Sequence, residues 1–220
     1  MLDDSKKETF DATFMGGHSF QWPKDNNENI IDRTINGEVD DVNYGKVNDR
    51  HFINITSFGF DADVAHNAWY MKKYTAVPNN MIYLASIFYS LYKFKNPHVK
   101  ISFNDMTLDQ QITMLAVCNG KYYGNGVPIA PNANYKDDLF NICLADKINK
   151  ARIPFLLNNV LNGKHEQYDF VHTYQTDHIK VEADEIINCN VDGEMLYSNC
   201  FEIGIVKNKM KVLRPKKTTY

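Results

Sequence analysis

The sequence lacks several features that assign a chain to a well-known class. Its cysteines form no Cys-x-x-Cys pair, which argues against a disulfide framework or a zinc site. A reducing cytoplasm is expected, and buried free thiols are predicted because the neighbours of three of the four cysteines alternate in strand fashion. No apolar run approaches the roughly 20 residues that span a bilayer, and the acidic, polar N-terminus does not have the pattern of a signal peptide. The cysteines are Cys118, Cys143, Cys189 and Cys200.

A basic surplus is also missing, since 24 Lys and Arg stand against 27 Asp and Glu. This balance argues against a nucleic-acid-binding protein, which usually carries excess positive charge. Hydrophobic residues make up 44% of the 220 residues, enough for one large domain, or for one domain plus a fragment of another. Residues 1–28 are polar and without periodicity, and a short helix is expected at 28–36.

Short stretches of alternating polarity, separated by turn signals, dominate the rest of the chain. Such a pattern favours a mainly β fold, a sandwich rather than a parallel α/β sheet. The first two predicted strands flank a turn at Asn48-Asp49. The predicted strands cover residues 42–46, 51–58, 99–103, 111–118, 139–145, 173–181, 186–191, 201–206 and 210–213.

One strongly helical region is predicted from Pro78 to Tyr92, with asparagines as N-terminal caps. Apolar residues such as Leu84 and Phe88 recur at three- and four-residue spacing and predict its core face. The helix also has a second, aromatic side. Its tyrosines either pack half-buried against the core, or form a surface that faces an acyl chain or a membrane interface. A shorter helix is predicted at 153–161, ended by Gly163. The aromatic side consists of Tyr83, Tyr89 and Tyr92.

Three segments carry residue types suited to chemistry, and each also has a plain structural explanation. The glycine-rich segment from Tyr123 to Ala133 lets the backbone approach a ligand closely, or forms an ordinary strand-to-strand turn. The acidic segment from Asn134 to Leu139 offers oxygens to a hard cation, or forms a solvated turn. In Asn190–Glu194, two carboxylates flank Gly193, as in a general-base site or a simple Asp-Gly hairpin.

Taken in order, these motifs resemble the second domain of bacterial diacylglycerol kinases, and more distantly sphingosine and ceramide kinases. The matching segments read HFINITSFGFDADV, YYGNGVPIAPNA followed by DD, and VDGE, and the resemblance extends from Trp22 to Pro215. It implies an NAD-kinase-like, two-sheet antiparallel β sandwich with a few helices at 39–220. Residues 1–38 are then a remnant or linker of a nucleotide-binding domain.

The resemblance also implies an activity. In this family, Mg²⁺ and ATP as co-substrate serve the phosphorylation of a diacylglycerol-like lipid hydroxyl at a membrane surface. The protein is then cytoplasmic and peripheral to the membrane, binds no nucleic acid, and a homodimer is left open. Glu194 matches the proton acceptor and Asp192 its acidic partner. Asn134, Asp137 and Leu139 match a largely structural Mg²⁺ site.

Three departures from the family pattern are present, and the first two favour a chain that is inactive alone. The Gly-Gly-Asp-Gly-Thr loop that holds ATP is absent, and Gly16-Gly17-His18-Ser19 does not replace it. Asn43 stands where the family usually has Asp, and Leu139 where it has Gly. Two interpretations therefore remain: a lipid-kinase domain that needs an ATP-binding partner, or a non-catalytic remnant that binds lipid or a partner. An NAD kinase fits the motifs less well.

Overall fold

The computed structural model describes residues 36–123 and 126–214. The Gly16–Ser19 segment and almost all of the helix predicted at 28–36 lie outside these residues. The elements follow the order β1 Glu38–Val47, β2 Arg50–Phe52, β3 Ile55–Gly59, α3 Phe60–Tyr74, α4 Asn79–Lys93, β4 His98–Phe103, β5 Met106–Cys118, β6 Phe140–Asp146, η2 Lys150–Arg152, α5 Ile153–Leu161, η3 His165–Gln167, β7 Val171–Thr176, β8 His178–Val191 and β9 Glu194–Arg214.

The strands form where the sequence alternates between apolar and polar residues. In β4, Val99, Ile101 and Phe103 are buried while their neighbours are more exposed, as expected when successive side chains point to opposite faces of a sheet. The predicted turn at Asn48-Asp49 joins β1 to β2, with Asn48 in the left-handed region at φ 51°. The strand predicted from 51 to 58 is interrupted, because β2 ends at Phe52 and β3 begins at Ile55.

All strand pairs are antiparallel, and the hydrogen-bonded order is β2-β1-β9-β8-β3-β5-β6-β7, with β4 paired to both β5 and β8. This path folds over on itself, because residues distant along it meet in the core. The ring of Phe52 in β2 stacks on Phe140 in β6 at 5.4 Å, and Phe58 in β3 meets Phe201 in β9 at 4.8 Å. The predicted antiparallel, sandwich-like architecture is confirmed, and its two layers are joined by continuous pairing.

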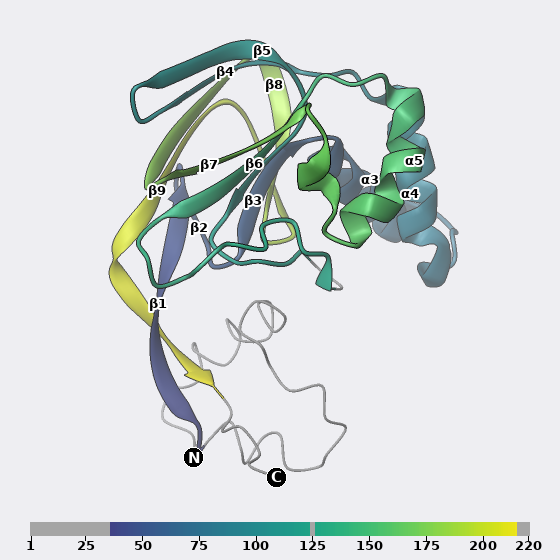
Figure 1. Ribbon diagram of the computed structural model, residues 1–220. Helices are drawn as coiled ribbons and strands as arrows, with labels where there is room; N and C mark the ends of the chain where they lie inside the picture. The colour runs from purple at the N-terminus through teal and green to yellow at the C-terminus, as the bar shows by residue number, and fades with distance from the viewer. Residues whose placement is uncertain (1–35, 124–125, 215–220) are drawn as a thin grey trace.

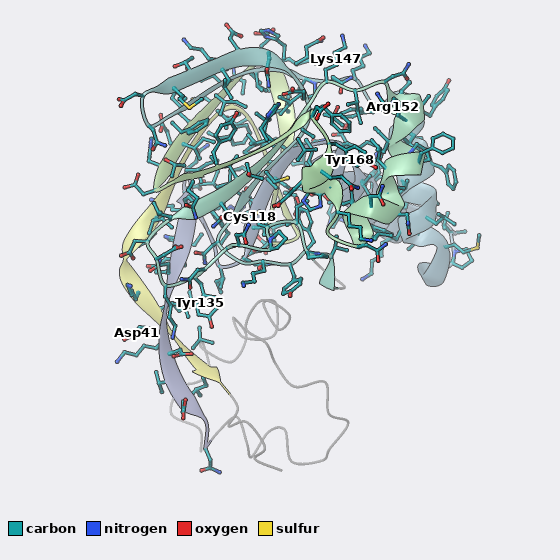
Figure 2. All side chains as sticks on the ribbon, viewed as in Figure 1. Asp41, Cys118, Tyr135, Lys147, Arg152 and Tyr168 are labelled. Atoms are coloured by element: carbon teal, nitrogen blue, oxygen red, sulfur yellow. The ribbon has the colours of Figure 1, made fainter. Side chains whose placement is uncertain are left out.

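The interior of the sandwich is one apolar cluster to which every strand contributes. Cys118, Cys143 and Cys189 are buried and Cys200 is half-buried, all as free thiols, so the prediction of unpaired cysteines is confirmed. Figure 2 shows Cys118 inside the molecule. Burial raises the pKa of the Cys143 and Cys189 thiols to about 12, and they therefore remain protonated at neutral pH.

Helix α3, which was not predicted from the sequence, begins directly after β3. Gly59 makes the junction with φ 83°, and a Cβ at this position would lie 2.4 Å from the carbonyl oxygen of Thr113, so glycine is required here. Only Phe60, Ala62 and Val64 of the helix are buried, all at its N-terminal end. The prediction that 78–92 is the one strongly helical region is therefore wrong.

Helix α4 lies where it was predicted, but its predicted core face is wrong. Leu84 and Phe88 are exposed, whereas Ser86 and Ser90 are buried. Asn67 of α3 donates a hydrogen bond of 2.7 Å to the Ser90 hydroxyl, so small polar residues face the neighbouring helix. Pro78 occupies the N-cap position without a side-chain capping bond, and the asparagine cap is therefore also wrong.

Helix α5 has the predicted bounds of 153–161. It joins α3 and α4 on one side of the sandwich, while β1 and β9 extend together away from the body as a two-stranded ribbon (Figure 1). The helices share a small apolar cluster that includes Phe60, Phe94 and Ile153. Within the described part of the chain, no helix has the length and apolarity needed to cross a membrane.

Candidate active site

The predicted Asp-Gly turn is the tight hairpin between β8 and β9. Val191 pairs with Glu194, and the two residues between them have φ values of 48° for Asp192 and 97° for Gly193. Positive φ at both central positions is typical of the hairpin turn that Asp-Gly favours. Nothing lies within 4 Å of a Cβ placed on Gly193; its positive φ, rather than crowding, explains the glycine.

The Asp192 carboxylate faces inward and holds the segment between β2 and β3. It accepts hydrogen bonds from three successive backbone N–H groups, those of Ile53 at 2.6 Å, Asn54 at 3.1 Å and Ile55 at 2.8 Å. Desolvation raises the pKa of this carboxyl, and the backbone bonds oppose the rise. The carboxylate therefore serves as an anchor for the backbone beside the turn, a use that the sequence pattern did not reveal.

The Glu194 carboxylate, two residues later, is turned toward solvent. Its side chain is 71% exposed and forms an ion pair of 3.0 Å with Arg50. An exposed pair of this kind contributes at most about 1 kcal/mol to stability and is easily broken. Glu194 is thus accessible to a ligand and free to exchange Arg50 for another partner, and its assignment as proton acceptor stays a prediction.

The predicted Mg²⁺ loop lies at the surface, beside β1. The Asn134 carbonyl accepts a hydrogen bond from Asp137 N at 3.3 Å, and the Asp137 carboxylate accepts one from Leu139 N at 3.1 Å. Asp138 has a φ of 60°, so the left-handed position falls on an aspartate, and Leu139 in place of glycine causes no backbone strain. Lys136, in the same loop, forms an ion pair of 2.8 Å with Asp40. Among the described residues, no lysine forms an ion pair with Asp137.

The predicted loop and turn are joined by a chain of hydrogen bonds. Tyr135 O accepts from Asn43 N at 2.7 Å, and Asn119 Nδ2 donates to Asn43 O at 2.8 Å and to Ile53 O at 2.6 Å. Ile53 N then donates to Asp192. Asn43, where the resemblance implies Asp, is fully buried, and its side-chain oxygen and nitrogen make no hydrogen bond within the described structure. Asn119 was missed because a lone Asn after an apolar strand carries no sequence signal.

The glycine-rich segment folds back on itself. Tyr123 N donates to Val127 O at 2.8 Å, and Gly126 has a φ of 76°. Beyond this turn, Ile129, Ala130 and Ala133 are buried. In the described residues the segment therefore forms a strand-to-strand connection, and its close approach to a ligand stays a prediction.

An apolar cavity of about 300 Å³ lies between the helices and the sheet. Residues of α3, α4 and α5 line it together with β5 and β6, and Tyr168, which lies beside α5 (Figure 2), also belongs to the lining. Asp61, Tyr123 and Asn190 give it one polar end. Asn190 belongs to the predicted turn, where its side-chain oxygen accepts from Gly193 N at 2.9 Å. Asp61 was not predicted from the sequence, although an acidic residue directly after Gly59-Phe60 was a signal for a helix N-terminus.

Residues 54–214 match the family described as YegS C-terminal NAD kinase beta sandwich-like domain. The chain is 25% identical over 203 residues to a diacylglycerol kinase of Mycobacterium tuberculosis, covering 90% of this chain and 64% of that protein. It is 24% identical over 164 residues to a diacylglycerol kinase of Staphylococcus saprophyticus, covering 74% and 53%. The chain thus spans between about half and two thirds of these relatives.

The fold also agrees with a solved structure. A crystal structure of a diacylglycerol kinase from Bacillus anthracis superposes with a TM-score of 0.62 at 17% identity, over 90% of this chain and 62% of that one. At this identity the likeness concerns the fold alone. Together with the family match over 54–214, it leads to one conclusion: the chain belongs to the diacylglycerol and lipid kinase family and contains its C-terminal, NAD-kinase-like β-sandwich domain.

Proposed function

We propose that the chain is the acceptor-binding half of an ATP-dependent lipid kinase, and that it presents a diacylglycerol-type hydroxyl for phosphorylation. One observation carries the proposal: the apolar cavity of about 300 Å³ reaches Asn190, whose side chain bonds the turn that bears Glu194. A cavity lined mainly by apolar side chains suits an acyl chain. A lipid held there has its polar end near the accessible carboxylate.

The chemistry assigned to this half is proton removal. The lipid oxygen forms a bond to the γ-phosphorus of ATP, the bond between that phosphorus and the ADP oxygen breaks, and Glu194 takes the hydroxyl proton. A general base must come within about 2.6–3.2 Å of that hydroxyl, or reach it through one water. The exposed Glu194 side chain and its weak pair with Arg50 leave it able to do so.

The 134–139 loop is the proposed Mg²⁺ site of this half. Asp137 would supply a carboxylate oxygen, and Asn134 and Leu139 backbone carbonyl oxygens. Mg²⁺ there would fix the position of the loop, and three protein oxygens leave room for the waters that this ion retains. Adding Mg²⁺ should raise the melting temperature of the wild-type chain and not that of Asp137→Ala. An equal response of both proteins would contradict the site.

The kinase proposal is tested in a rebuilt enzyme, made by fusing the nucleotide-binding domain of a relative and changing Asn43→Asp. Glu194→Gln keeps the shape and removes the basic oxygen, and turnover of diacylglycerol should fall roughly 10²–10⁴-fold. Glu202→Gln is the matched control, since Glu202 lies on the same strand and pairs with His178 at the surface. If the rebuilt enzyme is active and Glu194→Gln retains full turnover, Glu194 is only a hairpin residue.

The rival function, a non-catalytic lipid- or partner-binding remnant, is favoured by Asn43. This neutral, buried side chain occupies the position of a family carboxylate, beside the loop of the proposed Mg²⁺ site. Both functions predict that the chain alone forms no phosphatidic acid from diacylglycerol, ATP and Mg²⁺. The activity of the fused protein distinguishes the two functions. If the chain is a remnant, the fusion stays inactive both with Asn43 and with the Asn43→Asp substitution, whereas a rate near one per second, ordinary for an enzyme, excludes the remnant.

The proposed partner is the surface of an anionic membrane on the cytoplasmic side. Helices α3, α4 and α5 expose large apolar side chains, including Trp69, Phe88 and Tyr92, the last with 80% exposure. Lysines lie among them: Lys73 Nζ is 5.1 Å from the Trp69 ring centre, and Lys93 Nζ is 4.8 Å from that of Tyr89. Aromatic and basic side chains together suit the membrane interface and anionic headgroups.

Vesicle sedimentation tests this partner. The chain should sediment with phosphatidylcholine vesicles containing phosphatidylglycerol and less with phosphatidylcholine alone. Trp69→Ala combined with Phe88→Ala should reduce sedimentation several-fold. Ile186→Ala is the control, since Ile186 is 72% exposed but lies on β8. Equal sedimentation of both variants would reject the helical face as the membrane contact.

A further inference from the structure

We propose that Asp61, at the polar end of the apolar cavity, recognises the lipid headgroup by accepting a hydrogen bond from it. The site then selects an uncharged lipid with a free hydroxyl and disfavours fatty acids and phospholipids. This inference rests on the lipid-binding role proposed above and adds the residue that determines which lipid is held. Neither the motifs nor the family match assigns a role to Asp61.

Four separate elements bring this site together. Asp61 lies in the first turn of α3, Ser57 in β3, Asn190 in β8, and Tyr123 follows β5. The Ser57 hydroxyl donates to Asp61 Oδ2 at 2.6 Å. Asp61, Tyr123 and Asn190 all line the cavity. A carboxyl that a serine holds in one orientation at the end of an apolar space is arranged to meet a ligand.

Hydrogen-bonding capacity remains at this end of the cavity. The Ser57 hydroxyl donates to Asp61 Oδ2, and a carboxylate can accept several further hydrogen bonds. The Tyr123 hydroxyl is buried and has no hydrogen-bond partner of ordinary geometry in the described residues, although it lies near enough to Asp61 to lower the pKa of that carboxyl. By contrast, Thr113, which also lines the cavity, is fully used: it donates to Asn96 at 2.9 Å and accepts from Ile148 N at 2.9 Å. Unused buried polar groups are costly unless a ligand or water satisfies them.

The charge of the site sets the class of ligand. No Lys or Arg belongs to the described lining of the cavity, and the ring of its histidine, His165, is held through Nε2 at the Ile129 carbonyl. An anionic headgroup beside Asp61 would therefore meet a carboxyl with no Lys or Arg to offset the repulsion. Desolvation raises the pKa of Asp61, while the nearby polar side chains of Ser57, Tyr123 and Asn190 oppose the rise. A lipid hydroxyl can donate to the carboxylate and accept from the Tyr123 hydroxyl, which gives Tyr123 a partner of ordinary geometry.

The position of the site agrees with the proposed chemistry. Asn190 lies beside Asp61 and lowers the pKa of the Asp61 carboxyl by hydrogen bonding. The Asn190 side-chain oxygen also accepts a hydrogen bond from Gly193 N, in the turn before Glu194. One side chain therefore separates the headgroup site from the turn. The lipid hydroxyl has a single proton, so it donates to Asp61 while the lipid binds and to Glu194 when phosphoryl transfer begins. Asp61 is proposed as a positioning and specificity residue, and proton removal stays with Glu194.

The test is lipid binding by the full 220-residue chain, which requires neither ATP nor a nucleotide-binding domain. The probes are 1,2-dioctanoylglycerol and 1,2-dioctanoyloxypropane, which differ only in the free hydroxyl, each titrated calorimetrically below its critical micelle concentration. The wild-type chain should prefer the hydroxyl lipid by about 10- to 100-fold, the range for one hydrogen bond to a charged group. In Asp61→Leu the preference should fall to about twofold or less, with the deoxy lipid still bound.

The matched control is Asp63→Leu. Asp63 lies one position beyond Ala62 on the same helix, is partly buried, and accepts from Asn188 at 2.6 Å without lining the cavity. Asp63→Leu should keep the wild-type preference for the hydroxyl lipid. Tyr123→Phe should lower that preference by a smaller factor than Asp61→Leu does. Asp61→Asn, which keeps the shape, replaces Asp61→Leu if the latter fails to melt cooperatively.

The outcomes distinguish this inference from the kinase proposal. An equal preference in wild type and Asp61→Leu, with both lipids bound, would overturn the headgroup role of Asp61 and leave the kinase proposal standing. Binding of neither lipid would overturn the acyl-chain cavity and this inference together. Tighter binding of octanoic acid than of dioctanoylglycerol would overturn the selection for an uncharged headgroup.

Discussion

The strand sandwich and the helical layer bury their apolar residues in opposite ways. In the sandwich, rings from distant strands meet directly, as Phe58 does with Phe201 at 4.8 Å, and both are fully buried. In the helical layer, α4 turns Phe88 outward and Ser86 inward, and the helices enclose a cavity. Stability should therefore reside mainly in the sandwich, while the helices provide adaptable surface for a ligand. Binding elements are commonly drawn from the less stable parts of a protein.

The largest expected effect tests this contrast with two phenylalanines. Phe58→Ala removes a fully buried ring and should lower the free energy of unfolding by about 3–5 kcal/mol. Phe155→Ala removes a ring of α5 that is 82% exposed, and should change the free energy of unfolding by less than about 0.5 kcal/mol. Urea unfolding followed by circular dichroism measures both. Similar losses in the two variants would break the contrast.

A smaller effect separates the two carboxylates of the β8–β9 turn. Asp192→Ala leaves three backbone N–H groups without their acceptor and should cost about 2–4 kcal/mol, as loss of a buried charged acceptor does. Glu194→Ala breaks only an exposed pair and should cost less than about 1 kcal/mol. Thermal unfolding of both variants checks the difference. A costly Glu194→Ala would mean that this carboxylate is structural.

The smallest effect concerns Asp61 and pH. Desolvation raises its pKa in the folded protein above the ordinary value of 3.8, so the folded state keeps the proton to higher pH than the unfolded chain. This contribution to stability is complete below pH 3.8 and is lost as the pH rises through the raised pKa. In Asp61→Asn the loss is absent, so the melting temperature of this variant relative to wild type should increase from pH 3.5 to pH 7. Parallel melting curves across this range would contradict the shift.

The sequence predicted the sandwich better than the helices, for a physical reason. Strand alternation follows burial closely in β4, and β-branched and aromatic residues reinforce it. Helix α3 buries residues only in its first turns, so no apolar stripe runs along its length. What does identify it is charge: Asp61 and Asp63 occupy the first turn, and Lys72 and Lys73 the last, matching the helix dipole.

The face of α4 and the site residues show where sequence reasoning ends. Spacing alone could not reveal that Ser86 and Ser90 point inward, since serine usually lies at the surface. The Asp-Gly turn could be predicted because two adjacent residues determine its conformation. The link from Asn43 through Asn119 to Ile53 depends on residues 66 or more positions apart, and no local pattern encodes such a contact.

The pairing of β1 with β9 has a consequence for folding. Val47 lies opposite Ile203 and Glu38 opposite Arg214, whereas β2 pairs only with Gly45–Val47 of β1. The rest of β1 is therefore paired only when the last strand has been synthesised. Until then the earlier strands cannot complete the order seen in the folded sheet. Such long sequence separation slows folding to the range of milliseconds to seconds or beyond. While the chain grows on the ribosome, most of β1 thus lacks its partner strand, and chaperone binding should concentrate there.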